Sequence, residues 1–168
     1  MNELARAKAR YRKAADGSRQ RAVANLGPVL GGGFTLGRWG PKAKEAYRDQ
    51  WSEGVWDWEE IFSRYGEPDR LEIVVWADDC LCALGLATVT NQAVVVQFLQ
   101  GNPSPDCPFV GNRALICLEV AACYAQAMGR SEIRLYPKNE QLKAVFRDTF
   151  GFTLERPPSG RAYYRKGV

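Results

Sequence analysis

Histidine is missing from this chain of 168 residues. Serine and cysteine nucleophiles usually need a histidine as proton acceptor, so its absence excludes the Ser-His and Cys-His catalytic arrangements. Histidine is also a main ligand of zinc. Cys80 and Cys82 form a Cys-x-Cys pair, but no second cysteine pair lies near them in the sequence. The ligand set of a zinc site is therefore incomplete, and we expect no metal.

The sequence also lacks a long apolar run. No stretch of about 18 apolar residues occurs, which argues against a transmembrane helix. The N-terminus lacks the apolar segment of a secretory signal. We therefore expect a cytoplasmic protein without a membrane partner, whose five cysteines stay reduced. A hydrophobic content of 46% and a charged content of 25% are typical of one globular domain.

The basic charge is concentrated at the N-terminus. Residues 1–21 carry seven basic and two acidic side chains, whereas the rest of the chain has a net charge of −1. An Ala-, Lys- and Arg-rich helix is expected over residues 2–15, ended by Asp16, Gly17 and Ser18. We divide the chain into a basic helical arm (1–26) and a single domain (27–168). The arm suits contacts with nucleic acid or an acidic protein, or it is simply a solvated helix.

The first part of the domain combines glycine with aromatic residues. Gly31, Gly32 and Gly33 are not followed by the Gly-Lys-Ser/Thr of a phosphate loop, so we interpret them as a turn beside a strand near residues 34–38. Residues 41–66 have helical spacing with a break at 52–54. Their aromatic side chains either pack in the core or line a groove for an acceptor: Tyr47, Trp51, Trp58, Phe62 and Tyr65.

Strand patterns follow the helices. Residues 71–77, 81–90 and 93–100 alternate or are continuously apolar, and the short turns between them predict antiparallel pairing. A long helix is expected over residues 112–128, then a strand at 132–136. The remaining expected elements are a helix capped by Asn139, with Leu142, Val145, Phe146 and Phe150 on its buried face, and closing strands at 152–155 and 162–166.

The order of these elements and three motifs resemble the GCN5-related N-acetyltransferase (GNAT) superfamily. The motifs are Gly111 before the long helix, Asn139 before the last helix, and Gly151-Phe152 after it. The chain is similar to a divergent bacterial or phage-type member. The resemblance implies an α/β (α+β) fold: a central, mixed and mostly antiparallel sheet flanked by helices, in which the fourth and fifth strands splay apart.

The resemblance also implies an acetyl-CoA site in that gap. Backbone N–H groups before a helix are suited to bind the pyrophosphate. A backbone N–H of the fourth strand would polarise the thioester carbonyl. The residues at the positions of the family's cofactor site are Phe98, Leu99, Val110, Gly111, Asn112, Arg113, Ala114, Asn139 and Phe146.

The sequence departs from the family pattern at residues that carry chemistry. Arg113 replaces a small residue, and its guanidinium either reaches a phosphate or obstructs the backbone. Phe146 stands near the position of the family's proton-donating tyrosine, so Tyr136 is the nearest substitute, against a structural strand-end role. Three carboxylates are candidate bases by position only: Glu59, Glu72 and Asp106.

The resemblance predicts an acetyl-CoA-dependent N-acetyltransferase that acts on a primary amine. The amine would belong to a protein, a small molecule or a modified nucleobase. The alternative is a GNAT-fold protein that has lost catalysis and binds a protein or nucleic acid. Either protein would be a monomer or a homodimer.

Overall fold

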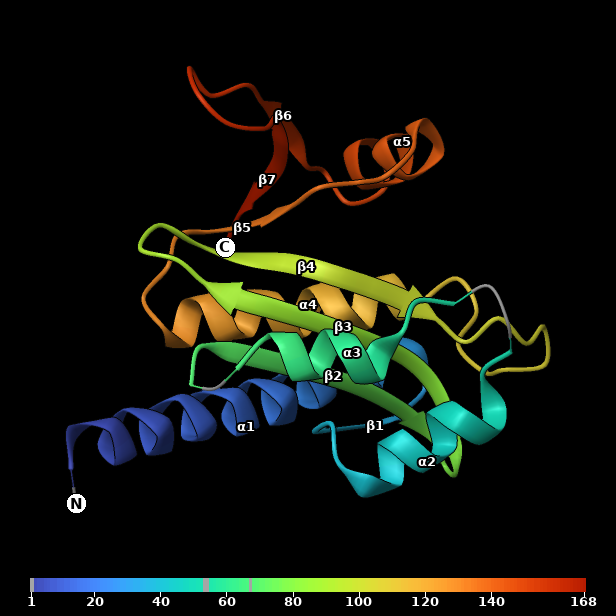
Figure 1. The fold of residues 1–168 in the computed structure, drawn as a ribbon. Coiled ribbons are helices and arrows are strands. Elements are labelled where there is room, and N and C mark those ends of the chain that lie inside the picture. Colours follow the sequence, from blue (N-terminus) through green and yellow to red (C-terminus); the bar gives the residue numbers. More distant parts are fainter. Residues whose placement is uncertain (1, 53–54, 67) are drawn as a thin grey trace.

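The structure is a computed structural model that describes residues 2–52, 55–66 and 68–168. Helices flank one sheet, with the chain running from a long N-terminal helix to a small C-terminal hairpin (Figure 1). In chain order the elements are α1 (Glu3–Leu30), β1 (Thr35–Gly37), α2 (Pro41–Gln50), α3 (Trp58–Arg64), β2 (Arg70–Ala77), β3 (Cys80–Val89), β4 (Ala93–Gly101), α4 (Arg113–Ala127), β5 (Glu132–Leu135), α5 (Glu140–Asp148), β6 (Thr153–Glu155) and β7 (Tyr163–Gly167).

The seven strands lie in the order β1-β2-β3-β4-β5-β7-β6. Every neighbouring pair is antiparallel except β4 and β5, which are parallel because α4 connects them. The expected mixed, mostly antiparallel sheet is therefore confirmed. The strands expected from residue 71 onward are all present, with ends that shift by at most one residue.

The parallel pair is short, and this opens the sheet. β4 pairs with β5 only from Ala93 to Val96, opposite Glu132 to Leu135. Pro137 follows β5 and has no N–H to continue the ladder. The rest of β4, up to Gly101, pairs only with β3. The expected splay of β4 and β5 is confirmed, and Figure 1 shows β5 and β7 turning away from the other strands.

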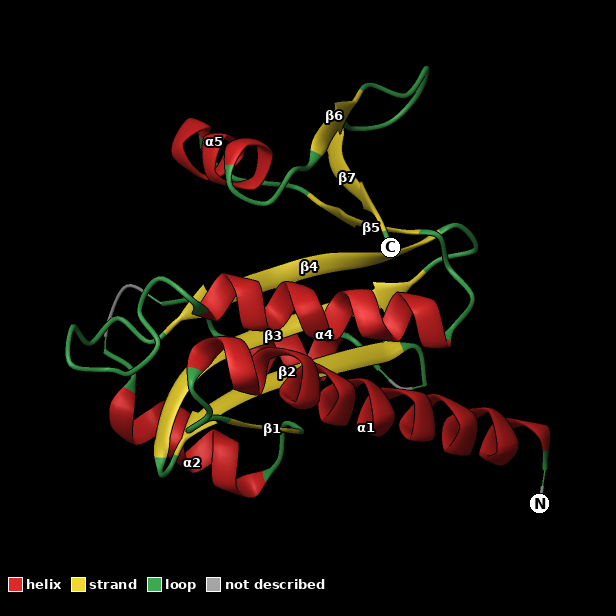
Figure 2. Ribbon diagram, turned by 180° about the vertical axis from the view of Figure 1, so that it is seen from behind, coloured by secondary structure: helices red, strands yellow, loops and turns green. Residues whose placement is uncertain are grey.

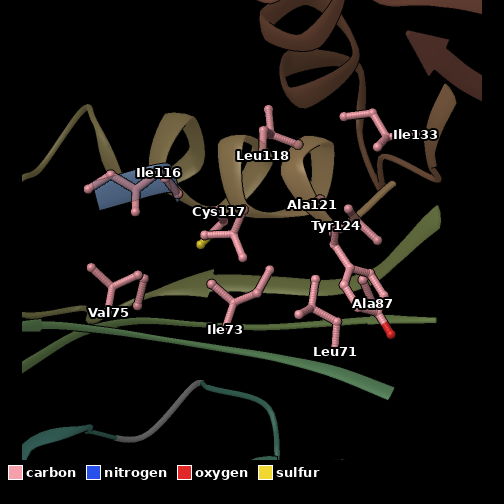
Figure 3. Packing of buried hydrophobic residues seen from close by; sticks show 14 of the residues in the cluster. Leu71, Ile73, Val75, Ala87, Ile116, Cys117, Leu118, Ala121, Tyr124 and Ile133 are labelled. Atoms are coloured by element: carbon pink, nitrogen blue, oxygen red, sulfur yellow. The ribbon is translucent and has the colours of Figure 1, made fainter. Parts of the chain in front are cut away.

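The two faces of the sheet have separate hydrophobic cores. Helices α1 and α4 cover one face, and α2 and α3 cover the other (Figures 1 and 2). Alternate residues of β2 serve each core, because side chains of a strand point to opposite faces in turn. Leu71 and Ile73 point to α4, where Figure 3 shows Leu71 near Tyr124 and Ile73 below Cys117. Val74 and Trp76 instead join the aromatic core under α2 and α3.

The helix expected to end at Asp16–Ser18 continues to Leu30, so that expectation was wrong. An interior glycine such as Gly17 costs about 1 kcal/mol relative to alanine. The helix tolerates this cost because it packs along α4, burying Ala22 completely. Gly31, with φ +80°, ends it. Residue 26 lies inside this helix, and the division of the chain there stays a prediction.

Helix α5 is less buried than its pattern predicted. Leu142 and Val145 are 40% and 38% exposed, so their assignment to a buried face was wrong. Phe146 is buried against Phe150 and Phe152. The difference arises because β5 and β7 turn away from β4 and leave α5 over the gap rather than over the sheet. None of the helices in the described part of the chain combines the length and apolar character that crossing a membrane requires.

Candidate functional site

A cleft of about 380 Å³ opens where β4 and β5 separate. The side chains of β4 and the start of α4 form one wall, and the segment from Leu135 to Phe146 forms the other. Seven of the ten residues predicted for the site line this cleft, while Val110, Gly111 and Asn112 lie in the loop before α4 and do not. The seven are Phe98, Leu99, Arg113, Ala114, Tyr136, Asn139 and Phe146.

The backbone of β4 offers hydrogen-bond donors to the cleft. Asn102 donates its backbone N–H to the carbonyl oxygen of Cys82 on β3 over 2.8 Å. Successive N–H groups of a strand point to opposite sides. Leu99, three positions earlier and in register with Gly85, therefore directs its N–H into the gap. This donor lies where no strand of the described chain competes for it.

The loop before α4 is held in an unusual backbone conformation. Phe109 and Gly111 have positive φ values of 65° and 90°. Glycine adopts this region freely, whereas phenylalanine does so at a cost. The Phe109 ring packs edge-on against Phe34, with 5.6 Å between centroids, which compensates for that cost. The side chain of Asn112 does not cap α4, so the first-turn N–H groups of α4 remain uncapped by that residue.

Arg113 fastens this loop to the sheet. Its Nη1 donates to the carbonyl oxygen of Asn102 over 2.6 Å and to that of Cys82 over 3.3 Å. A Cβ atom at Gly101 would lie 2.5 Å from the same nitrogen, so the glycine makes room for the guanidinium. Neither role considered from the sequence describes this arrangement fully. Arg113 lines the cleft, but its guanidinium is engaged by the backbone carbonyls of Asn102 and Cys82.

The predicted capping of the last helix by Asn139 is confirmed. Asn139 Oδ1 accepts a hydrogen bond from the N–H of Leu142 over 2.8 Å and so caps α5. Phe146 presents an apolar ring to the cleft and has no proton to donate. Tyr136, which was predicted to supply the proton instead, lines the cleft and is half-buried at the end of β5. Arg161 lies over its ring, with 4.6 Å from Cζ to the centroid.

An aromatic wall closes the side of the cleft next to α3, and the sequence predicted Phe98 in it but not Trp56. Trp56 packs edge-on against Phe98, with 5.4 Å between centroids. The Lys138 ammonium lies 3.5 Å from the centroid of the Trp56 indole, a cation–π contact. Gln100 Oε1 accepts hydrogen bonds from Trp56 N and Trp58 Nε1 over 3.1 and 2.9 Å. Trp56 lies before α3, outside any helical or strand pattern, so nothing in the sequence indicated that it lines the cleft.

The aromatic stripe in α2 and α3 is mainly core. Trp51, Trp58 and Phe62 are buried, and Tyr47 and Tyr65 pack against them. The structure thus favours the first of the two interpretations of the stripe. Among the residues that the structure describes, only Phe98 and Trp56 extend this aromatic cluster to the cleft.

The three candidate carboxylates lie elsewhere. Glu59 is paired with Arg48, with 2.5 Å between Oε1 and Nη2. Glu72 is 6% exposed and is held by Arg70. Asp106 is exposed beside another hollow. None of the described residues that line the cleft has a carboxylate.

The thiols in and next to the loop before α4 also lie outside the cleft. Cys107 and Cys80 are in contact, with 3.3 Å between their sulfur atoms. Burial raises the pKa of the Cys80 and Cys82 thiols, so neither is a ready thiolate nucleophile. These positions do not suit a covalent acyl-cysteine step at the cleft.

No protein-family model matches this sequence, and no curated protein matches it. Solved structures do match. The ribosomal-protein-S18-alanine N-acetyltransferase of Escherichia coli is 13% identical, with a TM-score of 0.59, over 80% of this chain and 94% of that one. The PaiA N-acetyltransferase of Thermoplasma acidophilum, in complex with coenzyme A, is 16% identical, with a TM-score of 0.52, over 80% and 99% of the two chains. The N-acetyltransferase PseH of Campylobacter jejuni, in complex with acetyl coenzyme A, is 13% identical, with a TM-score of 0.55, over 80% and 98%.

These similarities define the class of fold. Another match is to the GNAT domain of an S. lividans protein. Together with the strand order and the splayed β4/β5 pair, the matches show that this chain has the GNAT fold. At identities this low they show the fold alone, since one fold can host several functions.

Proposed function

We propose that this protein is an acetyl-CoA-dependent N-acetyltransferase that acetylates a primary amine. The observation that carries the proposal is the cleft between β4 and β5, with its uncovered β4 edge and the start of α4 beside it. Structural neighbours of this chain are acetyltransferases, two of them bound to coenzyme A or acetyl-CoA.

In this proposal different residues of the cleft bind different parts of acetyl-CoA. The Leu99 N–H donates to the thioester carbonyl oxygen, where negative charge develops during attack. The first-turn N–H groups of α4, at Arg113 and Ala114, bind the pyrophosphate with the backbone of Gly111. Leu142 and Phe146 supply apolar surface for the pantetheine arm, which explains why Leu142 is exposed on α5.

The proposed reaction needs little from the protein beyond positioning. The neutral amine attacks the carbonyl carbon, the C–S bond breaks, and the thiolate takes up a proton while the amine nitrogen loses one. Tyr136 is the proposed proton donor to the thiolate. Because the described cleft residues include no carboxylate, we propose that water accepts the proton of the amine. The rate should therefore increase as pH rises through the pKa of the acceptor amine.

A pair of single substitutions tests the cofactor site. Ala114→Glu places a carboxylate in the first turn of α4, where it suits the helix dipole but repels phosphate. We expect it to keep the melting temperature and weaken acetyl-CoA binding at least tenfold in calorimetry. Val29→Glu adds the same charge at a position that is 71% exposed and should bind like the wild type. Equal binding by both variants, or none by the wild type, contradicts the proposal.

A second function, binding without catalysis, is favoured because the cleft lacks the family's proton-donating tyrosine. Phe146 has no proton to donate, and the Arg113 guanidinium is engaged by the backbone carbonyls of Asn102 and Cys82. These features suit a GNAT-fold protein that binds coenzyme A, a protein or nucleic acid without catalysis. Release of free thiol from acetyl-CoA in the presence of varied amines distinguishes the two. Binding without release supports the second function, and a rate that Tyr136→Phe lowers without weakening binding supports the first.

A further inference from the structure

Three cysteines from two distant segments meet beside the loop that precedes α4. Cys80 and Cys82 lie at the start of β3, and Cys107 lies in that loop. The three sulfur atoms all lie within 4.8 Å of one another, and those of Cys80 and Cys107 are 3.3 Å apart. Cys82 and Cys107 are buried, whereas Cys80 is half-buried. None of the three cysteines lines the cleft, and the proposed acetyl transfer does not use them.

The fold creates the cluster by fixing both segments. Residues at i and i+2 of a strand point to the same side, which places the Cys80 and Cys82 thiols together. The loop is attached to the same strand by Asn102, whose backbone N–H donates to Cys82 O over 2.8 Å and whose Nδ2 donates to Leu81 O over 2.9 Å. Cys107 then turns back toward β3, with its N–H donating to Ser104 O over 3.2 Å.

We propose that Cys80, Cys82 and Cys107 bind a zinc ion through their three thiolates. Zinc–sulfur bonds of about 2.3 Å place sulfur atoms about 3.8 Å apart in tetrahedral geometry. The separations in the cluster, from 3.3 Å to within 4.8 Å, bracket that value. Thiolates prefer soft or borderline cations, so calcium and magnesium do not suit the site.

The site has an entrance and room for a fourth ligand. A hollow of about 400 Å³ on the surface is lined by Cys80 and Cys107, whereas Cys82 is fully buried. Asp79 and Asp106 also line the hollow. The fourth zinc position therefore faces water and two carboxylates, which is where a zinc ion arriving from solvent would enter.

The surrounding charge suits the bound ion. Three thiolates and Zn²⁺ have a formal charge of −1, and a cation nearby stabilises such a centre. Arg113 supplies it, since its Nη1 donates to the carbonyl oxygen of Cys82. On binding, three S–H bonds break, three Zn–S bonds form and three protons leave to solvent. The ion would then join the loop to β3 and hold it against the sheet.

Zinc competition with a chromophoric chelator tests the proposal on the full-length, reduced and metal-free protein. The wild type should take up one equivalent of Zn²⁺, and its melting temperature should rise. Cys80→Ser and Cys107→Ser should each weaken binding at least tenfold and remove the thermal shift. Cys123→Ser is the matched control, because Cys123 is a buried cysteine on α4 outside the cluster, and it should bind zinc like the wild type.

Cadmium gives a second readout that does not depend on stability. Thiolate-to-Cd²⁺ charge transfer absorbs in the ultraviolet, and its intensity should fall in Cys80→Ser and Cys107→Ser but not in Cys123→Ser. Wild-type affinity in a Cys80→Ser/Cys107→Ser double variant would overturn the proposal. So would a reduced wild type that cannot compete with the chelator. Neither result depends on acetyl transfer, so the two proposals can fail separately.

Discussion

Two tyrosines show how the surroundings of a single residue set its contribution to stability. Tyr124 is fully buried on α4, and its hydroxyl has no hydrogen-bond partner among the described residues. Burial raises its pKa, since a phenolate would be desolvated there. Tyr47 instead donates its hydroxyl to the carbonyl oxygen of Trp56 over 2.7 Å. Burial of the Tyr124 hydroxyl therefore costs desolvation energy without a hydrogen bond in return, whereas the Tyr47 hydroxyl forms one.

Replacing each tyrosine by phenylalanine should therefore have different effects on stability. Tyr124→Phe removes a buried, unbonded hydroxyl and should leave the free energy of unfolding unchanged or raise it by up to about 1 kcal/mol. Tyr47→Phe should lower it by about 1 kcal/mol. Urea denaturation of both variants and the wild type measures the difference. A loss of stability in Tyr124→Phe would show that its hydroxyl is bonded after all.

Single residues differ in how well the sequence predicts their roles. Asn139 was predicted as a helix cap, and it is one, because capping depends on neighbours within three positions. The partners of Arg113 were not predicted, because they belong to Asn102 and Cys82, which only the fold brings near. The contact of Cys107 with Cys80 was missed for the same reason.

Helix α1 shows tertiary contacts deciding the extent of an element. Arg19 is 6% exposed, and its Nε and Nη2 donate to the carbonyl oxygen of Glu72 over 3.0 and 2.7 Å. Asp16 pairs with the same guanidinium. Burial lowers the pKa of Arg19, and the charges of Glu72 and Asp16 oppose that shift. Part of the basic N-terminal sequence is therefore structural rather than a binding surface.

The Arg19 contacts predict a loss of stability when the guanidinium is removed. Arg19→Met should lower the free energy of unfolding by about 2–3 kcal/mol, because it removes two buried hydrogen bonds and an ion pair. Arg6→Met, at an exposed position of the same helix, should change it by less than about 0.5 kcal/mol. Denaturant titration compares the two. An equal loss of unfolding free energy in the two variants would show that the contacts of Arg19 with Glu72 and Asp16 do not stabilise the fold.

The proposed binding of nucleic acid by residues 1–21 needs a test that keeps this anchor. Deleting the segment would remove Arg19 and Ala15 from the folded protein and confound the result. Substituting glutamine for the exposed Arg6, Arg10 and Lys13 avoids this problem. Binding to duplex DNA that weakens in this variant and in high salt supports a basic surface, and unchanged binding refutes it.

The whole molecule has two cores that share one sheet. All five tryptophans of the sequence belong to or pack against the core under α2 and α3. The two longest helices, α1 and α4, lie on the other face (Figure 2). Strands β2 and β3 contribute residues to both cores. Loss of either core should therefore expose side chains of the other.

Unfolding should consequently be a single transition. Tryptophan fluorescence reports the α2/α3 face, and far-ultraviolet circular dichroism is dominated by α1 and α4 on the opposite face. Because β2 and β3 join the two faces, we expect both signals to change with the same urea midpoint. Midpoints that differ beyond experimental error would show that the faces unfold independently.

The sequence by itself determined the order of the elements and the antiparallel pairing of β2, β3 and β4, because periodicity, turns and caps act over a few residues. The GNAT fold was expected from the resemblance of that order and of three motifs to the family. The sequence also indicated seven of the sixteen described residues that line the cleft. Only the tertiary structure decided that α1 is one docked helix, that the carboxylates lie outside the cleft, and that three cysteines converge. These outcomes depend on contacts between distant segments, such as Arg19 with Glu72 and Cys80 with Cys107, which no local pattern encodes.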